Sequence, residues 1–168
     1  MTDSIRILGI DPGLRHTGWG VVEKTGSRLS HVAHGVINVD PELPMADRLA
    51  GIFYEVSRIV ETYKPDHSGC EEIIVNANPR SALKLGQARG AAMTALSYCG
   101  LEVAEFAPRQ IKLAVVGTGK ADKEQVGFMV ARLLPRAGKM REDAADALAC
   151  AICTAHNLPV RGLKGEAA

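Results

Sequence analysis

The sequence predicts one α/β domain built on a mixed five-stranded sheet that is flanked by helices. Its opening part alternates short apolar runs with turn residues, which is typical of an antiparallel meander. The remainder alternates single short strands with segments of helical periodicity, which predicts parallel crossovers. The chain has 168 residues, 46% of them apolar, so it can bury a core that needs no metal or disulfide for stability. We expect the domain to cover residues 1–157 and a flexible tail to follow over 158–168.

Three strands open the predicted sheet. The run Ile-Arg-Ile-Leu-Gly-Ile-Asp over residues 5–11 predicts a largely buried strand, which ends at the turn signal Pro12-Gly13. Residues 19–23 and 29–38 predict two further strands, joined by a turn around Gly26. Because consecutive strands with short turns pair antiparallel, these three form a meander.

The rest of the chain predicts five helices and two strands. Apolar residues recur at steps of three and four between Met45 and Tyr63, which predicts an amphipathic helix that Pro65 ends. Ser81 is a candidate N-cap for the second helix, and Pro108 is a candidate first residue of the third. In order, the predicted elements are a helix over 45–63, a strand over 67–75, a helix over 81–99, a strand over 103–107 and helices over 108–116, 123–134 and 142–156.

The composition argues against several classes of protein. A net charge of +1 and an aromatic share of 4% do not favour a protein whose whole surface attracts nucleic acid, or one that stacks single-stranded bases on rings. No apolar stretch approaches the roughly 20 residues of a membrane span. The N-terminus lacks the apolar segment of a signal peptide, so we expect a cytoplasmic protein.

The four cysteines indicate core residues. Cys150 and Cys153 form a C-x-x-C pair, but they lie inside an alanine-rich helical segment and no second ligand pair is spaced for zinc. We therefore expect small buried side chains and no disulfide.

Carboxylates occur at three places where a metal site could form. Asp11 ends an apolar strand, where its charge needs solvent, a partner or a cation. Glu71 and Glu72 lie in a strand and point to opposite faces, so at most one of them joins a shared site. Asp143 and Asp146 lie on one face of the last helix. Such a set of hard oxygen ligands suits Mg²⁺, and four of them can hold two ions. In the alternative interpretation no metal binds: Asp143 stabilises a helix N-terminus, Asp11 opens an Asx-turn, and the two glutamates lie on a solvated strand edge.

The basic residues are concentrated in one stretch. Residues 80–141 carry a charge of +7, from eleven basic and four acidic residues, and the remainder of the chain carries −6. A basic half beside an acidic cluster is the distribution expected of a protein that holds phosphates with Lys and Arg and cuts them at bound cations. An ordinary solvated surface is the alternative. The segment Gly117-Thr-Gly-Lys120-Ala resembles the end of a phosphate-binding loop but lacks its first Gly and its Ser or Thr.

Three segments carry a specific resemblance. They are Gly9-Ile-Asp-Pro-Gly-Leu-Arg-His-Thr-Gly18, Ser81-Ala-Leu-Lys-Leu-Gly-Gln-Ala-Arg-Gly90 and Asp143-Ala-Ala-Asp-Ala-Leu-Ala149. In this order they resemble the RuvC family of crossover junction endodeoxyribonucleases. The resemblance implies an RNase H-like fold, a homodimer and Mg²⁺-dependent resolution of four-way (Holliday) junction DNA by paired nicks near a short T-rich sequence. It also implies action beside the RuvA–RuvB branch-migration complex in recombination and DNA repair.

The resemblance also assigns roles to individual residues. It implies that the catalytic acids and metal ligands are Asp11, Glu71, Asp143 and Asp146; Glu71 is chosen over Glu72 because the family's glutamate lies ten residues before the serine that corresponds to Ser81. It implies that two lysines hold DNA phosphates close to the metals, and these match Lys112 and Lys123. We further expect DNA contacts from the other basic residues near these motifs, namely Arg80, Lys84, Arg89 and Lys120.

One position departs from the resemblance. Many relatives carry a Phe three residues after the catalytic glutamate, expected to stack on a base at the opened junction, whereas this chain has Ile74. An aliphatic side chain can still wedge between bases but does not stack as a ring does.

Three questions stay open at this level. The fold also suits a YqgF-like nuclease acting on RNA or linear substrates, although the Ser81–Gly90 segment argues against it. A non-catalytic junction-binding protein is the rival from another class, and retention of all four carboxylates argues against that. The helix over 81–99 holds Gly86, Gly90, Ala91 and Ala92, which suit a close dimer contact and packing within one subunit equally well.

Overall fold

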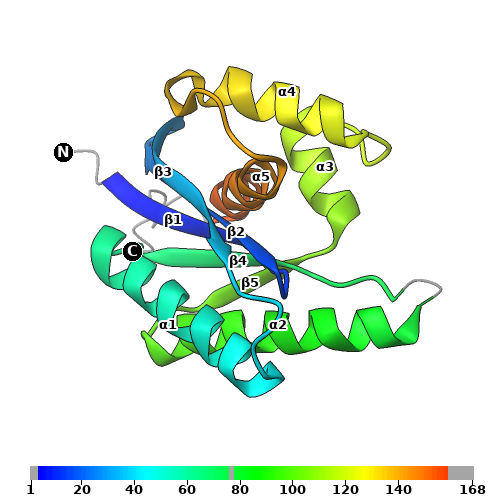
Figure 1. Cartoon of the computed structure of the whole chain (residues 1–168). Helices are drawn as coiled ribbons and strands as arrows, with labels where there is room; N and C mark the ends of the chain where they lie inside the picture. The colour runs from blue at the N-terminus through cyan, green and yellow to red at the C-terminus, as the bar shows by residue number, and fades with distance from the viewer. Residues whose placement is uncertain (1–3, 76–77, 159–168) are drawn as a thin grey trace, which may run out of the picture.

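The computed structural model describes residues 4–75 and 78–158, and it contains the predicted mixed five-stranded sheet (Figure 1). The predicted order of strands and helices is confirmed, with one short 3₁₀ helix, η1, added before the last helix. The elements are β1 (Ser4–Asp11), β2 (His16–Thr25), β3 (Arg28–Asn38), α1 (Met45–Tyr63), β4 (His67–Glu71), α2 (Pro79–Tyr98), β5 (Val103–Phe106), α3 (Pro108–Val116), α4 (Lys123–Leu133), η1 (Pro135–Ala137) and α5 (Glu142–Asn157).

The sheet has the strand order β3-β2-β1-β4-β5. β1 pairs antiparallel with β2, and β2 pairs antiparallel with β3, as the short turns between them require. β1 pairs parallel with β4, and β4 pairs parallel with β5. α1 leads from the meander into β4, and α2 connects β4 to β5, as parallel pairing requires a crossover. The carboxyl ends of β1 and β4 therefore lie side by side at one edge of the sheet.

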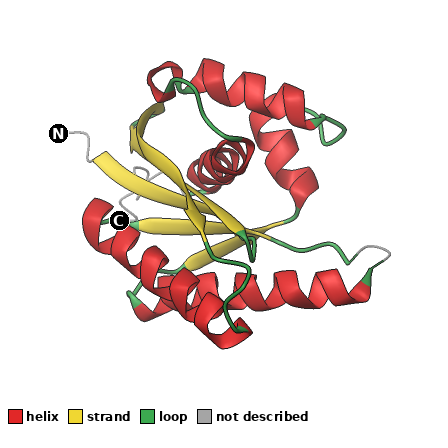
Figure 2. Ribbon diagram, in the orientation of Figure 1, coloured by secondary structure: helices red, strands yellow, loops and turns green. Residues whose placement is uncertain are grey.

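Helices cover both faces of the sheet (Figures 1 and 2). α1 and α2 pack on one face, where Ile52, Val56 and Leu96 are fully buried against Leu8 and Ile10 of β1. α5 crosses the other face, and α3 and α4 pack against it. The side chains of α5 from Ala147 to Cys153 are almost completely buried, so this helix forms the centre of the second core.

The cysteines are core residues, as predicted. Cys70, Cys150 and Cys153 are buried and Cys99 is half-buried, and all four are free thiols. No helix in the described parts of the chain is both long and apolar enough to cross a membrane.

Most predicted boundaries lie within one residue of the observed ones, but β2 begins at His16 and ends at Thr25, beyond the predicted strand over 19–23 at both ends. The end of β4 and the start of α2 also differ from the prediction. β4 ends at Glu71 and not at Val75, because its neighbours β1 and β5 end at Asp11 and Phe106 and leave residues 72–75 without a strand to pair with. The last link is the Glu72 N–H, which donates to the Phe106 carbonyl at 2.8 Å.

α2 begins two residues earlier than predicted, and its N-cap is not Ser81. Pro79 takes the first turn, and the Asn78 side chain accepts the N–H groups of Arg80 and Ser81 at 3.1 and 3.2 Å. The predicted flexible tail, residues 158–168, lies outside the described residues except for Leu158, so the domain boundary at residue 157 stays a prediction.

Candidate active site

Asp11 and Glu71 are neighbours across the parallel pair β1–β4. The register pairs Ile10 with Cys70, so these two acids follow as the next pair, each at the last position of its strand. Both acids point to the face of the sheet that α5 covers. Gly69 faces α5 so closely that a Cβ there would lie 1.9 Å from the Thr154 hydroxyl. Because side chains alternate along a strand, Glu71, two residues later, points to the same face.

α5 brings the other two acids to the same place. Asp143 and Asp146 occupy the first turns of α5, three residues apart on one side of the helix. The start of α5 lies directly over the strand ends, because a Cβ added to Gly18, which pairs with Asp11, would lie 1.9 Å from the Asp143 carbonyl oxygen. The absence of a side chain at Gly18 therefore lets the helix approach Asp11.

The four carboxylates form one electrostatic group. Burial, followed by the charges of Asp146, Glu71 and Asp143, raises the pKa of Asp11 to about 8. Burial, followed by the charge of Asp146, raises the pKa of Glu71. Burial also raises the pKa of Asp146, with further contributions from nearby acids. Groups that perturb one another in this way lie close together, and such an arrangement of acids needs a cation to hold all of its charge.

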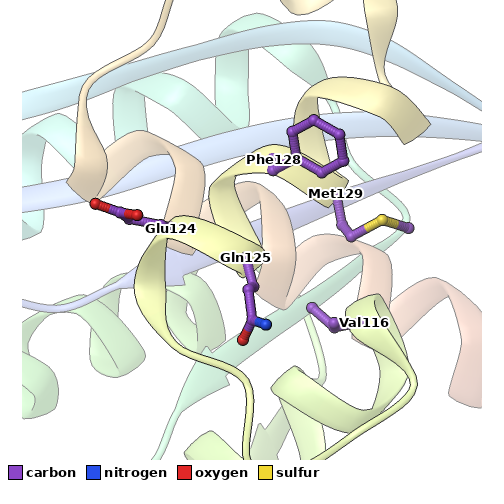
Figure 3. Close-up of a pocket in the computed structure, with 5 residues that line it drawn as sticks. All are labelled: Val116, Glu124, Gln125, Phe128 and Met129. Atoms are coloured by element: carbon purple, nitrogen blue, oxygen red, sulfur yellow. The ribbon is translucent and has the colours of Figure 1, made fainter.

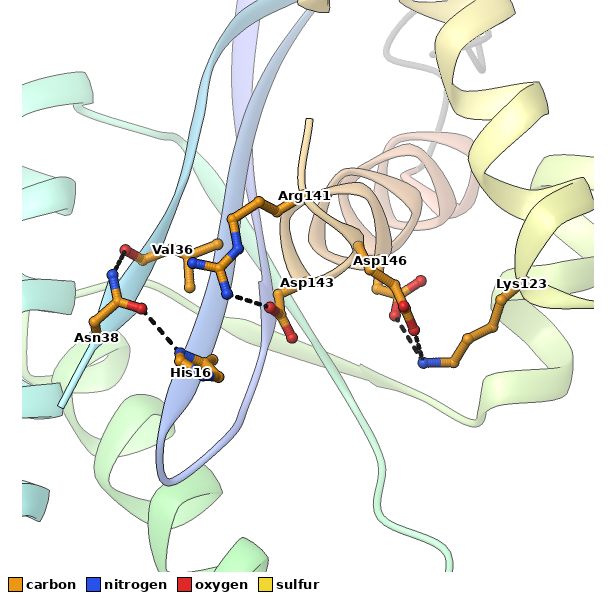
Figure 4. Close-up of polar contacts among 8 residues, drawn as sticks. His16, Val36, Asn38, Lys123, Arg141, Asp143 and Asp146 are labelled. Atoms are coloured by element: carbon orange, nitrogen blue, oxygen red, sulfur yellow. Dashed lines mark hydrogen bonds and ion pairs between the residues drawn. The ribbon is translucent and has the colours of Figure 1, made fainter. Parts of the chain in front are cut away.

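Lys123 supplies part of that positive charge. It begins α4, and its Nζ lies 3.6 Å from Asp146 Oδ2 while it also donates to Glu142 (Figure 4). The hydrogen bond to Glu142 raises the pKa of Lys123. The positive charge of Lys123 in turn offsets part of the rise in the pKa of Asp11, Glu71 and Asp146. Arg141, the residue before α5, pairs with Asp143 at 3.7 Å.

The sequence argument missed Glu142. Its signal was present, because a glutamate directly before Asp143 falls in the first turn of the same helix and is within reach of a lysine at the start of α4.

The donor set suits a divalent cation. Four carboxylates from β1, β4 and α5 offer the hard oxygen ligands that Mg²⁺ requires. The raised pKa values of Asp11, Glu71 and Asp146 are the response of crowded acids to burial and like charge. Across residues 4–75 and 78–158, no three His, Cys, Asp or Glu side chains are already gathered as a metal ligand set.

The other predicted site residues lie on α2, on α3 and in the segments that follow β4 and α3. Lys112 on α3 is close enough to Glu71 for its charge to lower the pKa of that acid. Arg80 and Lys84 are exposed in the first turns of α2, and Lys120 is exposed in the loop between α3 and α4. Ile74 is 61% exposed in the segment that leaves β4. Arg89 differs, since its guanidinium is engaged within the chain by the Glu71 carbonyl oxygen and the Glu105 carboxylate.

A separate hollow lies between α3 and α4 (Figure 3). Its volume is about 470 Å³, and it is lined by Val116, Glu124, Gln125, Phe128 and Met129. None of the four predicted acids lines it, so this hollow is distinct from the candidate active site.

A five-stranded mixed sheet with acids at two parallel strand ends and on the helix above them is the arrangement of an RNase H-like nuclease. The sequence pattern of the family described as "Crossover junction endodeoxyribonuclease RuvC" matches residues 7–154. A protein of that description from Hyphomonas neptunium is 66% identical over 167 residues, covering 99% of this chain and 100% of the relative. Another from Caulobacter vibrioides is 55% identical over 151 residues, covering 90% and 89%. The chain belongs to the RuvC family of crossover junction endodeoxyribonucleases.

Solved structures agree with this assignment. A Thermus thermophilus RuvC structure in complex with a Holliday junction substrate superposes with a TM-score of 0.83 at 32% identity, covering 90% of this chain and 93% of the other. The yeast mitochondrial Holliday junction resolvase Ydc2 superposes with a TM-score of 0.63 at 14% identity, covering 88% and 77%, and shows the fold alone. The predicted family, the RNase H-like fold and the predicted enzyme, a phosphodiester-hydrolysing nuclease of recombination and repair, are confirmed.

Proposed function

We propose that this protein resolves four-way DNA junctions by paired symmetric nicks, with two Mg²⁺ ions held by Asp11, Glu71, Asp143 and Asp146. The observation that carries the proposal is the mutual coupling of these four acids at one edge of the sheet. Asp11 lies between the others in the fold, with Glu71 beside it on β4 and the start of α5 above it, so it is the acid best placed to serve both ions.

The residues of the chain divide the chemistry between them. Bound divalent cations supply an activated water and stabilise the leaving oxygen of the phosphodiester. The cations would be held by the four carboxylates of Asp11, Glu71, Asp143 and Asp146. Positive charge would reach the same phosphate from Lys123 and Lys112. Hydrolysis then breaks the P–O3′ bond and leaves 5′-phosphate and 3′-hydroxyl ends. Binding of a cation requires Asp11 to release the proton that its raised pKa lets it keep near neutral pH.

The exposed basic residues around this edge are proposed to hold the arms of the junction. Arg80 and Lys84 at the start of α2 and Lys120 in the α3–α4 loop extend the positive charge away from the acids. In this proposal they contact phosphates and set position, without reading sequence. Ile74 is exposed close to Glu71 and is proposed to wedge between bases at the crossover.

A homodimer suits a substrate with near two-fold symmetry, because each subunit can nick one strand. On α2, Ala88, Ala92 and Ala95 are buried within the chain, whereas Gly86 and Gly90 are exposed and have no neighbouring atoms within 4 Å of an added Cβ. Internal packing therefore accounts for the alanines and leaves the two glycines for a partner subunit. Action beside the RuvA–RuvB complex is part of the same proposal.

The test is a comparison of substrates and variants with Mg²⁺. The wild-type protein should cleave a synthetic four-way junction at paired symmetric positions and leave a linear duplex of the same sequence and a structured RNA largely intact. Asp146→Asn should lose more than the roughly 10–100-fold that removal of an outer-shell metal partner costs. Glu61→Gln, which changes an exposed acid on α1, is the matched control and should cleave normally.

Equal cleavage by Asp146→Asn and wild type would contradict the site. A preference for structured RNA would favour a YqgF-like activity, and tight junction binding with no product in Mg²⁺ or Mn²⁺ would favour a non-catalytic binding protein.

A further inference from the structure

The sheet holds the Glu71 peptide on one side only, through its pairing with Phe106 of β5. Glu71 is the last residue of β4, and residues 72–75 after it pair with no strand. The ladder ends with the Glu72 N–H on the Phe106 carbonyl at 2.8 Å. A proposed metal ligand at a free strand end needs a further contact to hold its peptide, because outer-shell partners orient metal ligands.

Arg89 of α2 makes that contact. Its Nε donates to the Glu71 carbonyl oxygen at 2.9 Å, and its Nη2 donates to the carboxylate of Glu105 on β5. The Arg89 side chain is only 17% exposed. One guanidinium therefore ties together α2, the end of β4 and β5.

Arg89 acts from the face of the sheet opposite the four acids. Glu105 is in register with Cys70, whose side chain points away from the face shared by Gly69 and Glu71. The charge of Glu72 acts on the Arg89 guanidinium, whereas the acids that raise the pKa of Asp11 are Asp146, Glu71 and Asp143. Arg89 thus contacts the backbone that carries Glu71 and leaves the Glu71 carboxylate free on the other side.

We propose that Arg89 is a positioning residue of the nuclease: anchored by Glu105, it fixes the Glu71 peptide at the end of β4 and so directs the Glu71 carboxylate toward Asp11 and Asp146. This inference rests on the proposed metal-binding function of Glu71. It assigns Arg89 a role inside the protein in place of the DNA contact expected from the sequence, and it gives Glu105 the role of its anchor.

The primary test measures binding of Mn²⁺ alone to the DNA-free protein. For Arg89→Ala, we expect the Kd for Mn²⁺ to rise about 10-fold or more, within the range found for outer-shell partners. Arg89→Lys should recover part of this loss, because the shorter ammonium side chain keeps the charge without the planar two-pronged geometry. Arg58→Ala, which removes the exposed Arg58–Glu55 pair on α1, is the matched control and should bind Mn²⁺ as the wild type does.

Two further readouts separate positioning from other roles. Junction affinity measured in EDTA should change by less than about 2-fold, because Arg89 holds no phosphate in this account. Glu105→Ala should weaken Mn²⁺ binding in the same direction, and the double variant should be no worse than Arg89→Ala, since contacts in one network are not additive. If Arg89→Ala fails to fold, Arg89→Lys and Glu105→Ala carry the test.

The outcomes are distinct. Wild-type Mn²⁺ affinity in Arg89→Ala, or in both Arg89→Lys and Glu105→Ala, overturns the positioning role. A large loss of junction affinity in EDTA with unchanged Mn²⁺ affinity overturns it in favour of a DNA contact. If the wild-type protein itself binds no Mn²⁺ and cleaves no junction, the proposed function fails and this inference falls with it.

Discussion

Asp11 is the residue on which the proposed chemistry of this protein depends most. It lies at the end of β1, largely buried, with three other acids near it. The same crowding that makes the group suitable for a cation makes it unfavourable for folding without one, because a buried charge with like charges beside it is destabilising. Function and stability therefore oppose each other at this side chain.

Asp11→Asn should stabilise the metal-free protein while abolishing cleavage. The folded pKa of about 8 lies far above the ordinary 3.8, so between these values the folded state keeps a proton that the unfolded state releases. The contribution of Asp11 therefore lowers stability as pH rises from about 4 to about 8, with a limiting slope of about 1.4 kcal/mol per pH unit. Asp11→Asn removes the titrating carboxyl group and with it this pH-dependent loss of stability.

The measurement is thermal unfolding in EDTA at several pH values. The Tm of Asp11→Asn should exceed that of wild type by several degrees at pH 8, at about 2–4 °C per kcal/mol, and by much less at pH 5. Glu61→Gln should show no such trend. A constant or negative difference in Tm across this range would argue against a strongly perturbed Asp11.

Lys123 should act on both the acids and the DNA. Its charge lowers the pKa of Asp11, Glu71 and Asp146, so Lys123→Ala should raise all three and shift the rising limb of the cleavage–pH profile to higher pH. Loss of one phosphate contact should also reduce the salt slope of junction binding by about 1.

Lys139→Ala, which removes an exposed lysine from the loop before α5, is the matched control. Unchanged junction affinity, salt slope and pH profile in Lys123→Ala would remove this lysine from the site.

At the scale of elements, the end of β4 matters most. The apolar run Ile73-Ile74-Val75 looks like a continued strand, but β1 and β5 stop beside Glu71 and leave it unpaired. Ile74 and Val75 are consequently 61% and 72% exposed, next to the proposed catalytic edge. The early strand end thus leaves an exposed apolar side chain where the proposed contact with bases needs one.

Ile74→Phe should strengthen the opening of the junction. An aromatic ring gains base stacking worth about 1–3 kcal/mol per base, and Ile74→Ser should lose the wedge. Fluorescence of 2-aminopurine placed at the crossover measures the unstacked base directly, and it should increase with Phe and decrease with Ser relative to wild type. Leu113→Ser, which changes another exposed aliphatic side chain, on α3, is the control. Identical fluorescence for all four proteins would exclude Ile74 from the crossover.

For the whole molecule, much of the architecture follows from the sequence. Periodicity and turn residues predict all five strands and all five α-helices in order, because apolar alternation and punctuation by Pro and Gly are local signals. The end of β4 is set by the neighbouring strands β1 and β5, which is not a local signal, and its prediction is wrong. The start of α2 is set by the Asn78 cap and Pro79, local signals that the choice of Ser81 as N-cap overlooks. The resemblance selected Glu71, and the close approach of α5 to Gly69 places that side chain on the face of the acids.

The contacts of charged side chains are harder to predict from the sequence than the helices and strands are. Arg89 belongs to the basic stretch by composition, yet its partners Glu71 and Glu105 come from two strands that only the folded sheet brings together. The contact between Lys123 and Glu142 likewise depends on α4 and α5 lying side by side, although the place of Glu142 beside Asp143 is visible in the sequence. Net charge hides the same information, since +1 is the sum of a basic stretch and an acidic remainder.

The central claim is that Asp11, Glu71, Asp143 and Asp146 form one divalent-cation site. The most direct measurement is an anomalous difference map from crystals soaked in MnCl₂, with Asp11→Asn crystals as the comparison. We expect manganese peaks bounded by these four carboxylates in the wild-type protein and their loss or marked weakening in the variant. Manganese bound only elsewhere, or equally strong peaks in Asp11→Asn, would contradict it.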